Sequence, residues 1–263
     1  MSFSGKVCLI TGGALGIGRC LTRVFAKQGC RIAFLDKDRQ AGEENASWLL
    51  RHGYDVLFIA GDAGQQEDLE RFVGGVQERF GQADFLINNA CVSHRGLLSG
   101  CGYEDFVEVL RIGVAAPYYL TKLCLPLFSE GACVVNISST RASQSQADTE
   151  SYTAAKGGIS ALTHAMAVSL SGKVRVNAIS PGWIDTGTFH DGSYQPQYSE
   201  GDTMQHPSGR VGTPEDIARA ALFLCSEKNS FLNAENLTVD GGMSHLMVYH
   251  ADEGWEYHPK RHR

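Results

Sequence analysis

The sequence predicts an α/β fold in which helices cover both faces of a parallel sheet of about seven strands. Short apolar runs alternate with longer amphipathic stretches along most of the 263 residues, a pattern typical of this doubly wound class. The apolar runs are continuous, as at residues 85–87 and 134–137, which indicates strands that are buried on both faces. No Pro/Gly/Ser-rich linker and no repeat divides the chain, so we expect one domain over residues 1–263.

The individual elements follow from the same alternation. Strands are predicted near 6–10, 31–35, 55–60, 84–87, 132–138, 173–179 and 235–239, and helices near 16–28, 38–52, 66–80, 103–128, 151–171 and 214–226. A long irregular stretch at about 185–211 is predicted to be a lid, because loops of that length in a domain are usually functional; a disordered surface insertion is the alternative. A C-terminal extension at about 244–263 mixes apolar and charged residues, which favours either an intersubunit contact or docking on its own subunit.

Composition excludes several classes of function. The chain has 23 Lys plus Arg against 29 Asp plus Glu and a net charge of −6, which argues against nucleic-acid binding. No apolar segment reaches the roughly 18 residues that a membrane helix needs. The eight cysteines form no Cys-x-x-Cys pair and the nine histidines have no metal-ligand spacing, so we expect free, mostly buried thiols and no metal site. We therefore expect a cytoplasmic protein that binds small molecules.

A glycine-rich turn follows the first strand and opens the first helix. It is Thr11-Gly12-Gly13-Ala14-Leu15-Gly16-Ile17-Gly18, in which glycines let the backbone approach a pyrophosphate and the helix N-terminus offers free N–H groups. The spacing Gly-x-x-x-Gly-x-Gly differs from the usual Gly-x-Gly-x-x-Gly. We expect a Rossmann-type fold in which Gly12, Leu15, Gly16, Ile17 and Gly18 contact a dinucleotide.

Acidic and amide residues at the next strand ends extend this predicted cofactor site. Asp36 ends the second strand, eighteen residues after Gly18, where a carboxylate meets the adenosine ribose. It would repel a 2′-phosphate, so NAD is favoured over NADP, although Lys37 could soften the preference. Asp62 with Ala63 after the third strand is placed to contact the adenine, and Asn89 with Ala90 follows the fourth strand; ordinary turn chemistry is the alternative for both pairs.

Tyr152-Thr-Ala-Ala-Lys156, with Ser139 thirteen residues upstream, predicts an acid/base site for an alcohol or ketone. Residues four apart share a helix face. A free phenol ionises too weakly near pH 7 for easy proton abstraction, and a neighbouring ammonium favours its ionised form. Alone, the five-residue pattern is weak because Tyr and Lys are ordinary on amphipathic helices.

Taken together, in order and spacing, these motifs resemble the short-chain dehydrogenase/reductase family from Lys6 to about Met243. The resemblance implies that Tyr152 is the general acid/base, that Ser139 binds the same substrate oxygen, and that Lys156 also holds the nicotinamide ribose. It further implies that the nicotinamide carboxamide is framed by Pro181, Gly182, Ile184 and Thr186. It implies a homo-oligomer, a tetramer or dimer, with helices 103–128 and 151–171 as candidate faces.

Two positions depart from the family pattern. Gly113 stands where the family usually has an Asn whose main-chain carbonyl holds a water in the proton path from Lys156. Glycine could keep the carbonyl but weakens a helix by about 1 kcal/mol relative to Ala. Cys91 stands where Gly is commoner; we expect a small buried residue, with a reactive thiol as the alternative.

The substrate is not specified by the sequence. Candidate pocket residues are His94, Arg141, Gln144, Trp183 and His190. Hydrogen-bonding groups suit a polyol or sugar, Arg141 could hold a carboxylate, and aromatic residues could cover a steroid. The predicted function is NAD-dependent interconversion of a secondary alcohol, of polyol, sugar, steroid or hydroxyacyl type, and its ketone. The alternatives are a catalytically silent NAD-binding regulatory protein on the same fold and a 3-oxoacyl thioester reductase.

Overall fold

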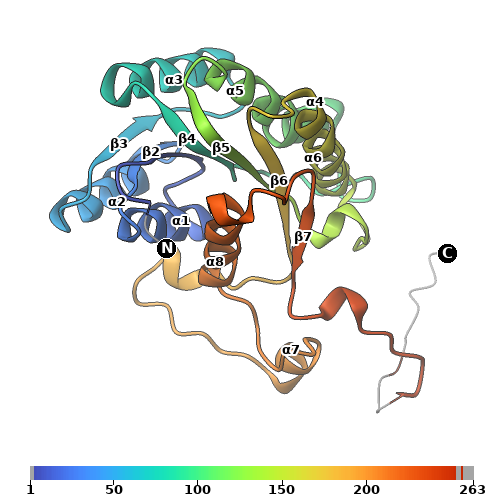
Figure 1. Cartoon of the computed structure of the whole chain (residues 1–263). Helices are drawn as coiled ribbons and strands as arrows, with labels where there is room; N and C mark the ends of the chain where they lie inside the picture. The colour runs from blue at the N-terminus through green and yellow to red at the C-terminus, as the bar shows by residue number, and fades with distance from the viewer. Residues whose placement is uncertain (1–2, 253–255, 257–263) are drawn as a thin grey trace.

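Seven parallel strands form one sheet at the centre of the computed structural model, which describes residues 3–252 and 256 (Figure 1). The strands are β1 Val7–Thr11, β2 Arg31–Asp36, β3 Val56–Ala60, β4 Ala83–Asn88, β5 Phe128–Ile137, β6 Arg175–Pro181 and β7 Asn236–Val239. Their order across the sheet is β3-β2-β1-β4-β5-β6-β7. The predicted doubly wound parallel fold is confirmed. The order reverses between β1 and β4, and ligands of such sheets bind beyond the carboxyl ends of the strands at this reversal.

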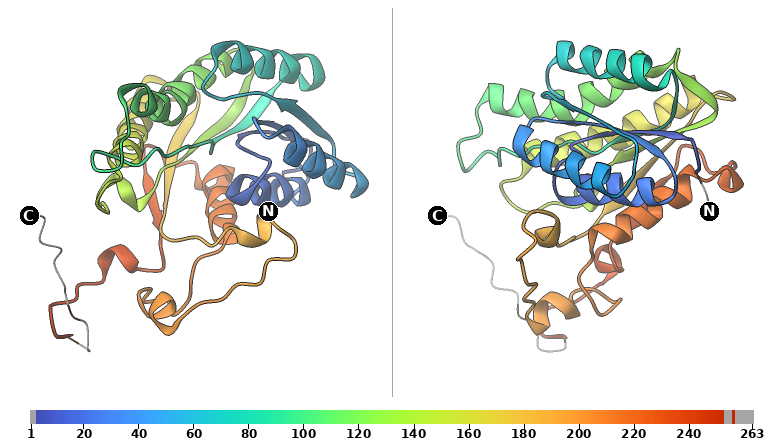
Figure 2. Two further views of the ribbon diagram at one scale, coloured as in Figure 1. Left: turned by 180° about the vertical axis from the view of Figure 1, so that it is seen from behind. Right: turned by 90° about the vertical axis from the view of Figure 1, so that its left-hand side faces the viewer.

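Helices cover both faces of the sheet (Figures 1 and 2). One layer holds α1 Gly16–Lys27, α2 Arg39–Arg51 and α8 Pro214–Cys225, and the other holds α3 Gln66–Phe80, α4 Tyr103–Leu110, α5 Ala116–Cys124 and α6 Glu150–Ser169. Alternate residues of β1 enter the two layers: Cys8 and Ile10 pack with α1 and α8, whereas Val7 and Leu9 pack with α3 and α5. This alternation follows from the period of two along a strand and explains the continuous apolar runs.

The single helix predicted over 103–128 is wrong in two respects. A π-helical turn, Arg111–Ala115, joins α4 to α5, and α5 ends at Cys124, two residues before Pro126, whose nitrogen cannot donate a helical hydrogen bond. The next strand, β5, begins at Phe128 instead of 132. Gly131 has φ +76 and the pairing with β4 is irregular beside it, so this part of the strand resembles a turn in sequence.

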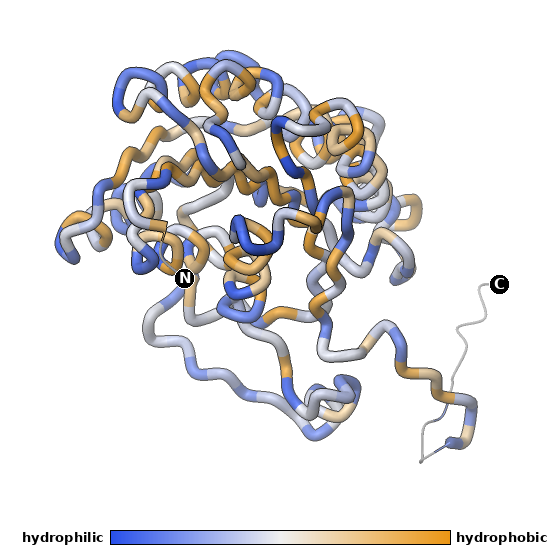
Figure 3. The backbone as a smooth tube through the Cα atoms, viewed as in Figure 1, coloured by the Kyte–Doolittle hydropathy of each residue, from blue (hydrophilic) through white to orange (hydrophobic). Residues whose placement is uncertain are grey.

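The segment 185–211, predicted to be a lid, leaves the carboxyl edge of the sheet and carries the short helix α7, Glu200–Met204 (Figure 1). Figure 3 shows it as largely hydrophilic. Asp185 connects its two halves, because its carboxylate accepts hydrogen bonds from the Tyr194 hydroxyl at 3.0 Å and the Tyr198 hydroxyl at 2.5 Å. Burial and the bond to Asp185 raise the pKa of Tyr198 to about 12. A lid function for this segment stays a prediction.

The described part of the C-terminal extension runs away from the sheet (Figure 1). Leu246, Met247 and Tyr249 are all exposed in it, so in this structure they do not dock on the chain's own core. The remainder, including Trp255, lies outside the described residues, except for Glu256. In the described part of the chain, no helix combines the length and the apolar character needed to cross a membrane.

Candidate active site

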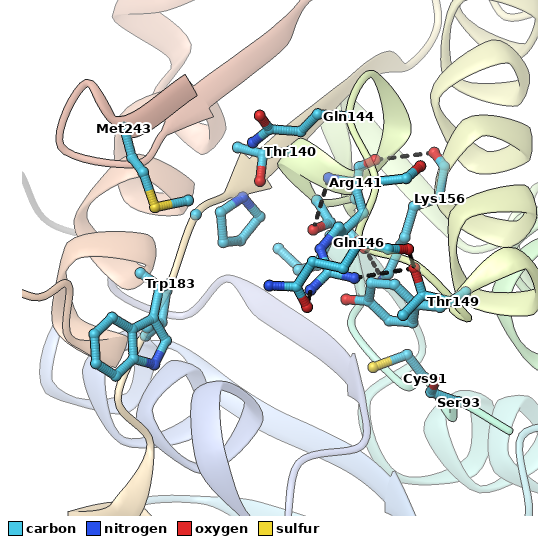
Figure 4. Close-up of a pocket in the computed structure, with 18 of the residues that line it drawn as sticks. Cys91, Ser93, Thr140, Arg141, Gln144, Gln146, Thr149, Lys156, Trp183 and Met243 are labelled. Carbon is cyan, nitrogen blue, oxygen red and sulfur yellow. Dashed lines mark hydrogen bonds between the residues drawn. The ribbon is translucent and has the colours of Figure 1, made fainter. Parts of the chain in front are cut away.

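A cavity of about 840 Å³ opens at the carboxyl edge of the sheet, between the segments that follow β4, β5 and β6. Ser139, Tyr152 and Lys156 all line it, although they come from a strand end and from α6. Figure 4 shows polar side chains of the segment after β5 around this space, with Trp183 and Met243 on the opposite side. The predicted acid/base residues therefore share one cavity.

Helix α6 presents Tyr152 and Lys156 one turn apart on the same face. The Lys156 ammonium lies 5.3 Å from the centre of the Tyr152 ring and donates to the Ile137 carbonyl at 2.7 Å. The lysine is only 3% exposed, so its charge acts in a region that water screens weakly.

Ser139 is oriented by the turn that follows it. Its Oγ accepts the Arg141 backbone N–H at 3.1 Å, and the residue is buried. No acceptor for its own hydroxyl proton occurs within the described residues, so the proton is available to an oxygen in the cavity. A hydroxyl donor, a phenol and an ammonium together can bind an alcohol or carbonyl oxygen and move a proton to or from it.

The glycine-rich turn after β1 has backbone positions at which a side chain would be strained or would clash. Gly12 has φ +66, and a Cβ there would lie 3.0 Å from the Ala90 Cα. A Cβ on Gly18 would lie 1.8 Å from the Gly12 carbonyl oxygen. The Asn89 amide donates to the Thr11 and Gly12 carbonyls, both at 3.0 Å. Asn89 therefore fixes the turn in addition to lining the cavity. Helix α1 begins without a side-chain cap, so its first N–H groups can bind an anion.

Asp36 lies at the end of β2 beside this turn. Its Oδ2 accepts the Ala14 N–H at 2.9 Å and its Oδ1 accepts the Asp38 N–H at 3.0 Å. These bonds hold the carboxylate in one orientation and leave lone pairs on both oxygens for further donors. A cradle of glycines next to a fixed carboxylate fits the pyrophosphate and ribose of a dinucleotide.

The other predicted cofactor residues lie at neighbouring strand ends. Pro181, Gly182, Ile184 and Ile17 line the main cavity. Asp62 accepts the Gly64 N–H at 2.8 Å and borders a smaller cavity of about 200 Å³, while Ala63 is buried. Thr186 lies against Gly16: a Cβ on that glycine would be 3.6 Å from the Thr186 Cβ.

Comparisons with known proteins agree on one family. A family model described as enoyl-(acyl carrier protein) reductase matches residues 12–244. An uncharacterized oxidoreductase of Thermotoga maritima is 39% identical, over 93% of this chain and 98% of its own length, and L-fucose dehydrogenase of Mus musculus is 36% identical, over 91% and 89%. An apo SCOR enzyme from Clostridium thermocellum superposes with a TM-score of 0.88 at 38% identity, covering 97% of this chain and 99% of that one.

The chain is a short-chain dehydrogenase/reductase. It is therefore an oxidoreductase of a family that uses nicotinamide cofactors. The resemblance inferred from the sequence is confirmed at the level of family and fold, with the match running from the glycine-rich turn to the residues after β7.

In this short-chain dehydrogenase/reductase, Gly113 is buried in the π-helical turn against α6. A Cβ at Gly113 would lie 2.9 Å from the Ala155 Cβ, closer than side-chain carbons approach. Ala155 is the neighbour of Lys156 in the Tyr152-to-Lys156 segment. The absent side chain thus lets the π-helical turn pack directly on α6, the helix that carries Tyr152 and Lys156. A π-helical turn is a one-residue insertion in an α-helix, and such insertions occur often at functional sites.

Three of the five predicted substrate residues line the cavity of the short-chain dehydrogenase/reductase, namely Arg141, Gln144 and Trp183. His94 does not, because its ring bonds Glu108 of α4 at 2.8 Å. His190 lies at the glycine-rich turn instead: a Cβ on Gly16 would be 3.3 Å from its Nε2.

Other lining residues were not predicted or were predicted wrongly. Cys91 is exposed and lines the cavity, so the expectation of a small buried residue is wrong. Ser93, Gln205 and Met243 also line it without having been predicted. Gln205 and Met243 come from segments far apart in sequence with no motif at either position, and only the fold places them together.

Proposed function

We propose that this chain oxidises a secondary alcohol with NAD, or reduces the matching ketone. The observation that carries the proposal is the shared cavity of Ser139, Tyr152 and Lys156 next to the glycine-rich turn. Each residue type has a task at the same oxygen atom, and the cavity leaves room for a small substrate beside them.

In the oxidation, the ionised Tyr152 takes the hydroxyl proton of the alcohol. Ser139 donates a hydrogen bond to the same oxygen and holds it in reach of the phenol, and the buried Lys156 ammonium stabilises the ionised ring before the proton arrives. The nicotinamide, when bound, accepts the hydride from the substrate carbon. In the reduction, Tyr152 gives its proton to the carbonyl oxygen.

The preference for NAD is argued from Asp36. The Gly12-to-Gly18 turn and the first N–H groups of α1 would hold the pyrophosphate, and the Asp36 carboxylate would accept from the adenosine ribose hydroxyls. A 2′-phosphate would bring negative charge next to this fixed carboxylate. Lys37 is exposed beside it and would offset only part of this repulsion, because water screens exposed charges.

The lining supports a polar substrate. Around the three acid/base residues, the cavity is bordered by the side chains of Ser93, Gln144, Ser145 and Gln146, which offer hydrogen bonds to hydroxyl groups. A relative 36% identical acts, by its name, on L-fucose. A long acyl chain, as in a 3-oxoacyl thioester, would leave these donors unpaired, so a hydroxylated substrate is favoured.

Tyr152→Phe tests the mechanism. The phenylalanine keeps the ring and removes the proton carrier, so turnover of every alcohol should fall by at least about 100-fold, while NAD affinity measured by calorimetry should stay within about twofold. Tyr118→Phe, at an exposed position on α5, is the matched control. It keeps the ring at a proposed self-association face and should retain full activity. Undiminished turnover by Tyr152→Phe would refute the assignment.

Asp36→Ala tests the choice of cofactor. Loss of the carboxylate should weaken NAD and remove the repulsion of NADP, so the ratio of kcat/KM for NAD over NADP should fall by at least about tenfold. Asp38→Ala changes the same charge on the next exposed carboxylate and should alter the ratio much less. An unchanged ratio in Asp36→Ala would place the ribose contact elsewhere.

Self-association, as a tetramer or dimer, is proposed from the exposed apolar residues of the predicted faces. Tyr103 of α4, Tyr118 of α5 and Val168 of α6 are 80%, 54% and 71% exposed, whereas Ile159 and Met166 of α6 are buried in the chain's own fold. Sedimentation that finds only monomer would contradict the proposal.

A further inference from the structure

The charge of the cavity is one-sided. Its described lining includes two cationic side chains, Lys156 and Arg141, and neither Asp nor Glu. The whole chain carries a net charge of −6, so a cationic cavity is not a reflection of overall composition. Lys156 has a role beside Tyr152, and this leaves Arg141 as a cation without an assigned task.

The Arg141 guanidinium is held by neutral groups. Its NH1 donates to the Thr149 Oγ1 at 3.2 Å and its NH2 makes a close hydrogen bond to the Gln146 Oε1. A guanidinium has five N–H groups, and the other three have no partner among the residues the structure describes. No carboxylate of the described chain lies within ion-pair distance of this half-buried guanidinium.

The side chain is also fixed in place. Arg141 belongs to the turn Thr140–Ala142, and its backbone N–H bonds the Ser139 Oγ. Thr149, which accepts from the guanidinium, is itself tied to the Gln146 carbonyl at 2.8 Å. Figure 4 shows Arg141 between Gln146, Thr149 and Lys156, at the wall of the cavity. Ser139 and Arg141 thus line the same cavity.

We propose that the substrate is a hydroxy acid, a hydroxylated carbon chain whose carboxylate binds Arg141. A carboxylate would pair with the free N–H groups in the bidentate manner that arginine favours and would compensate the cavity's positive charge. The reaction stays that of the proposed function, on which this inference rests: the carbinol hydrogen leaves as hydride to NAD, the hydroxyl proton passes to Tyr152, and a keto acid forms.

Matched substrates test the proposal. A panel of 2- and 3-hydroxy acids and of five- and six-carbon aldonates is compared with the corresponding amides and alditols, with NADH formation followed by absorbance. The wild-type enzyme should prefer an acid over its own amide by about 100-fold in kcat/KM. In Arg141→Gln this preference should fall below about tenfold, because the KM for the acid rises. The kcat for the amide should change little.

Two further variants separate the role of the guanidinium from that of its charge and from loss of any surface cation. Arg141→Lys retains the charge without the fork and should give an intermediate preference, which also serves if the Gln variant does not fold. Arg51→Gln removes one cation from the exposed end of α2 and should leave the preference unchanged. If the enzyme oxidises amides and alditols as well as acids, or if Arg141→Gln retains the preference, the hydroxy-acid inference is overturned. If no alcohol at all is oxidised, the proposed function itself fails.

Discussion

Gly113 allows a prediction that joins the fold to the active site. The glycine lies in the π-helical turn Arg111–Ala115, and its missing Cβ would lie 2.9 Å from the Ala155 Cβ. We predict that Gly113→Ala destabilises the protein and disturbs the acid/base pair, and that Ala155→Gly in the same chain relieves both effects. Gly113→Asn, which restores the side chain usual in the family, should behave like Gly113→Ala or worse.

The magnitude follows from two opposing terms. Carbon atoms of packed side chains sit at about 3.5–4.0 Å, so the new methyl group must push α6 and the π-helical turn apart by about 0.6–1 Å. Such overpacking costs about 1–3 kcal/mol, whereas replacing glycine by alanine in a helix contributes about 1 kcal/mol. The net change in wild type is a loss of up to about 2 kcal/mol. In a chain that also carries Ala155→Gly, the clash is absent and only the favourable helical term at position 113 remains.

A double-mutant cycle measures this contact. Urea unfolding of the wild type, both single variants and the double variant should give a coupling free energy of about 1–3 kcal/mol in favour of the double variant. A displacement approaching 1 Å at Tyr152 can lower kcat by as much as about 100-fold, so Gly113→Ala should lose activity and the double variant should regain most of it. Additive stabilities within about 0.5 kcal/mol, or a fully active Gly113→Ala, would show that this packing does not matter.

Three other changes probe the surroundings of the site. His190→Ala should weaken NAD binding about fivefold in calorimetry and leave adenosine binding unchanged. The His190 ring lies at the glycine-rich turn, where it can donate to a phosphate. Equal or tighter NAD binding would refute that role. Asp216→Asn should cost about 1–2 kcal/mol of stability at pH 7, because Asp216 accepts the Thr213 N–H that begins α8 and bonds Arg210. The Arg210 bonds lower the pKa of Asp216. The stabilisation that Asp216 provides is therefore complete above the ordinary carboxyl pKa near 4 and is lost as the pH falls through the lowered pKa. The urea midpoints of variant and wild type should converge in acid and stay apart at pH 7. Asp185→Asn should loosen segment 185–211 by weakening the bonds from Tyr194 and Tyr198, which limited proteolysis would detect as faster cleavage there, and an unchanged cleavage rate would argue against this anchor.

Much of the fold is predictable from local pattern. The strands of a doubly wound sheet are buried on both faces, so each appears as an uninterrupted apolar run, and the predicted strands lie within a few residues of those observed. The errors occur where local chemistry and tertiary structure disagree. Residues 129–131 resemble a turn yet belong to β5, because pairing of Phe128 with Ala83 continues past the irregularity.

The residues proposed for acid/base chemistry could be selected from the sequence because that chemistry needs fixed residue types at fixed spacing. Tyr152 and Lys156 must be one helical turn apart, and the structure places both in the cavity with Ser139. The substrate side has no such constraint. His94 and Gln144 are both polar residues in loops, and only the fold shows that one bonds Glu108 while the other lines the cavity.

Gly113 shows how the meaning of a residue can change once its neighbours are known. In sequence it is a defect, a helix-weakening residue where the family usually has an amide side chain. In the structure it is one half of a contact whose other half, Ala155, lies within the acid/base segment. The π-helical turn adds one residue to the helical turn at this point and brings the backbone onto α6, where a larger residue would have to displace its neighbour. The position of Tyr152 and Lys156 therefore depends on the absence of a side chain at 113, and restoring the usual residue should impair the site that it supports elsewhere in the family.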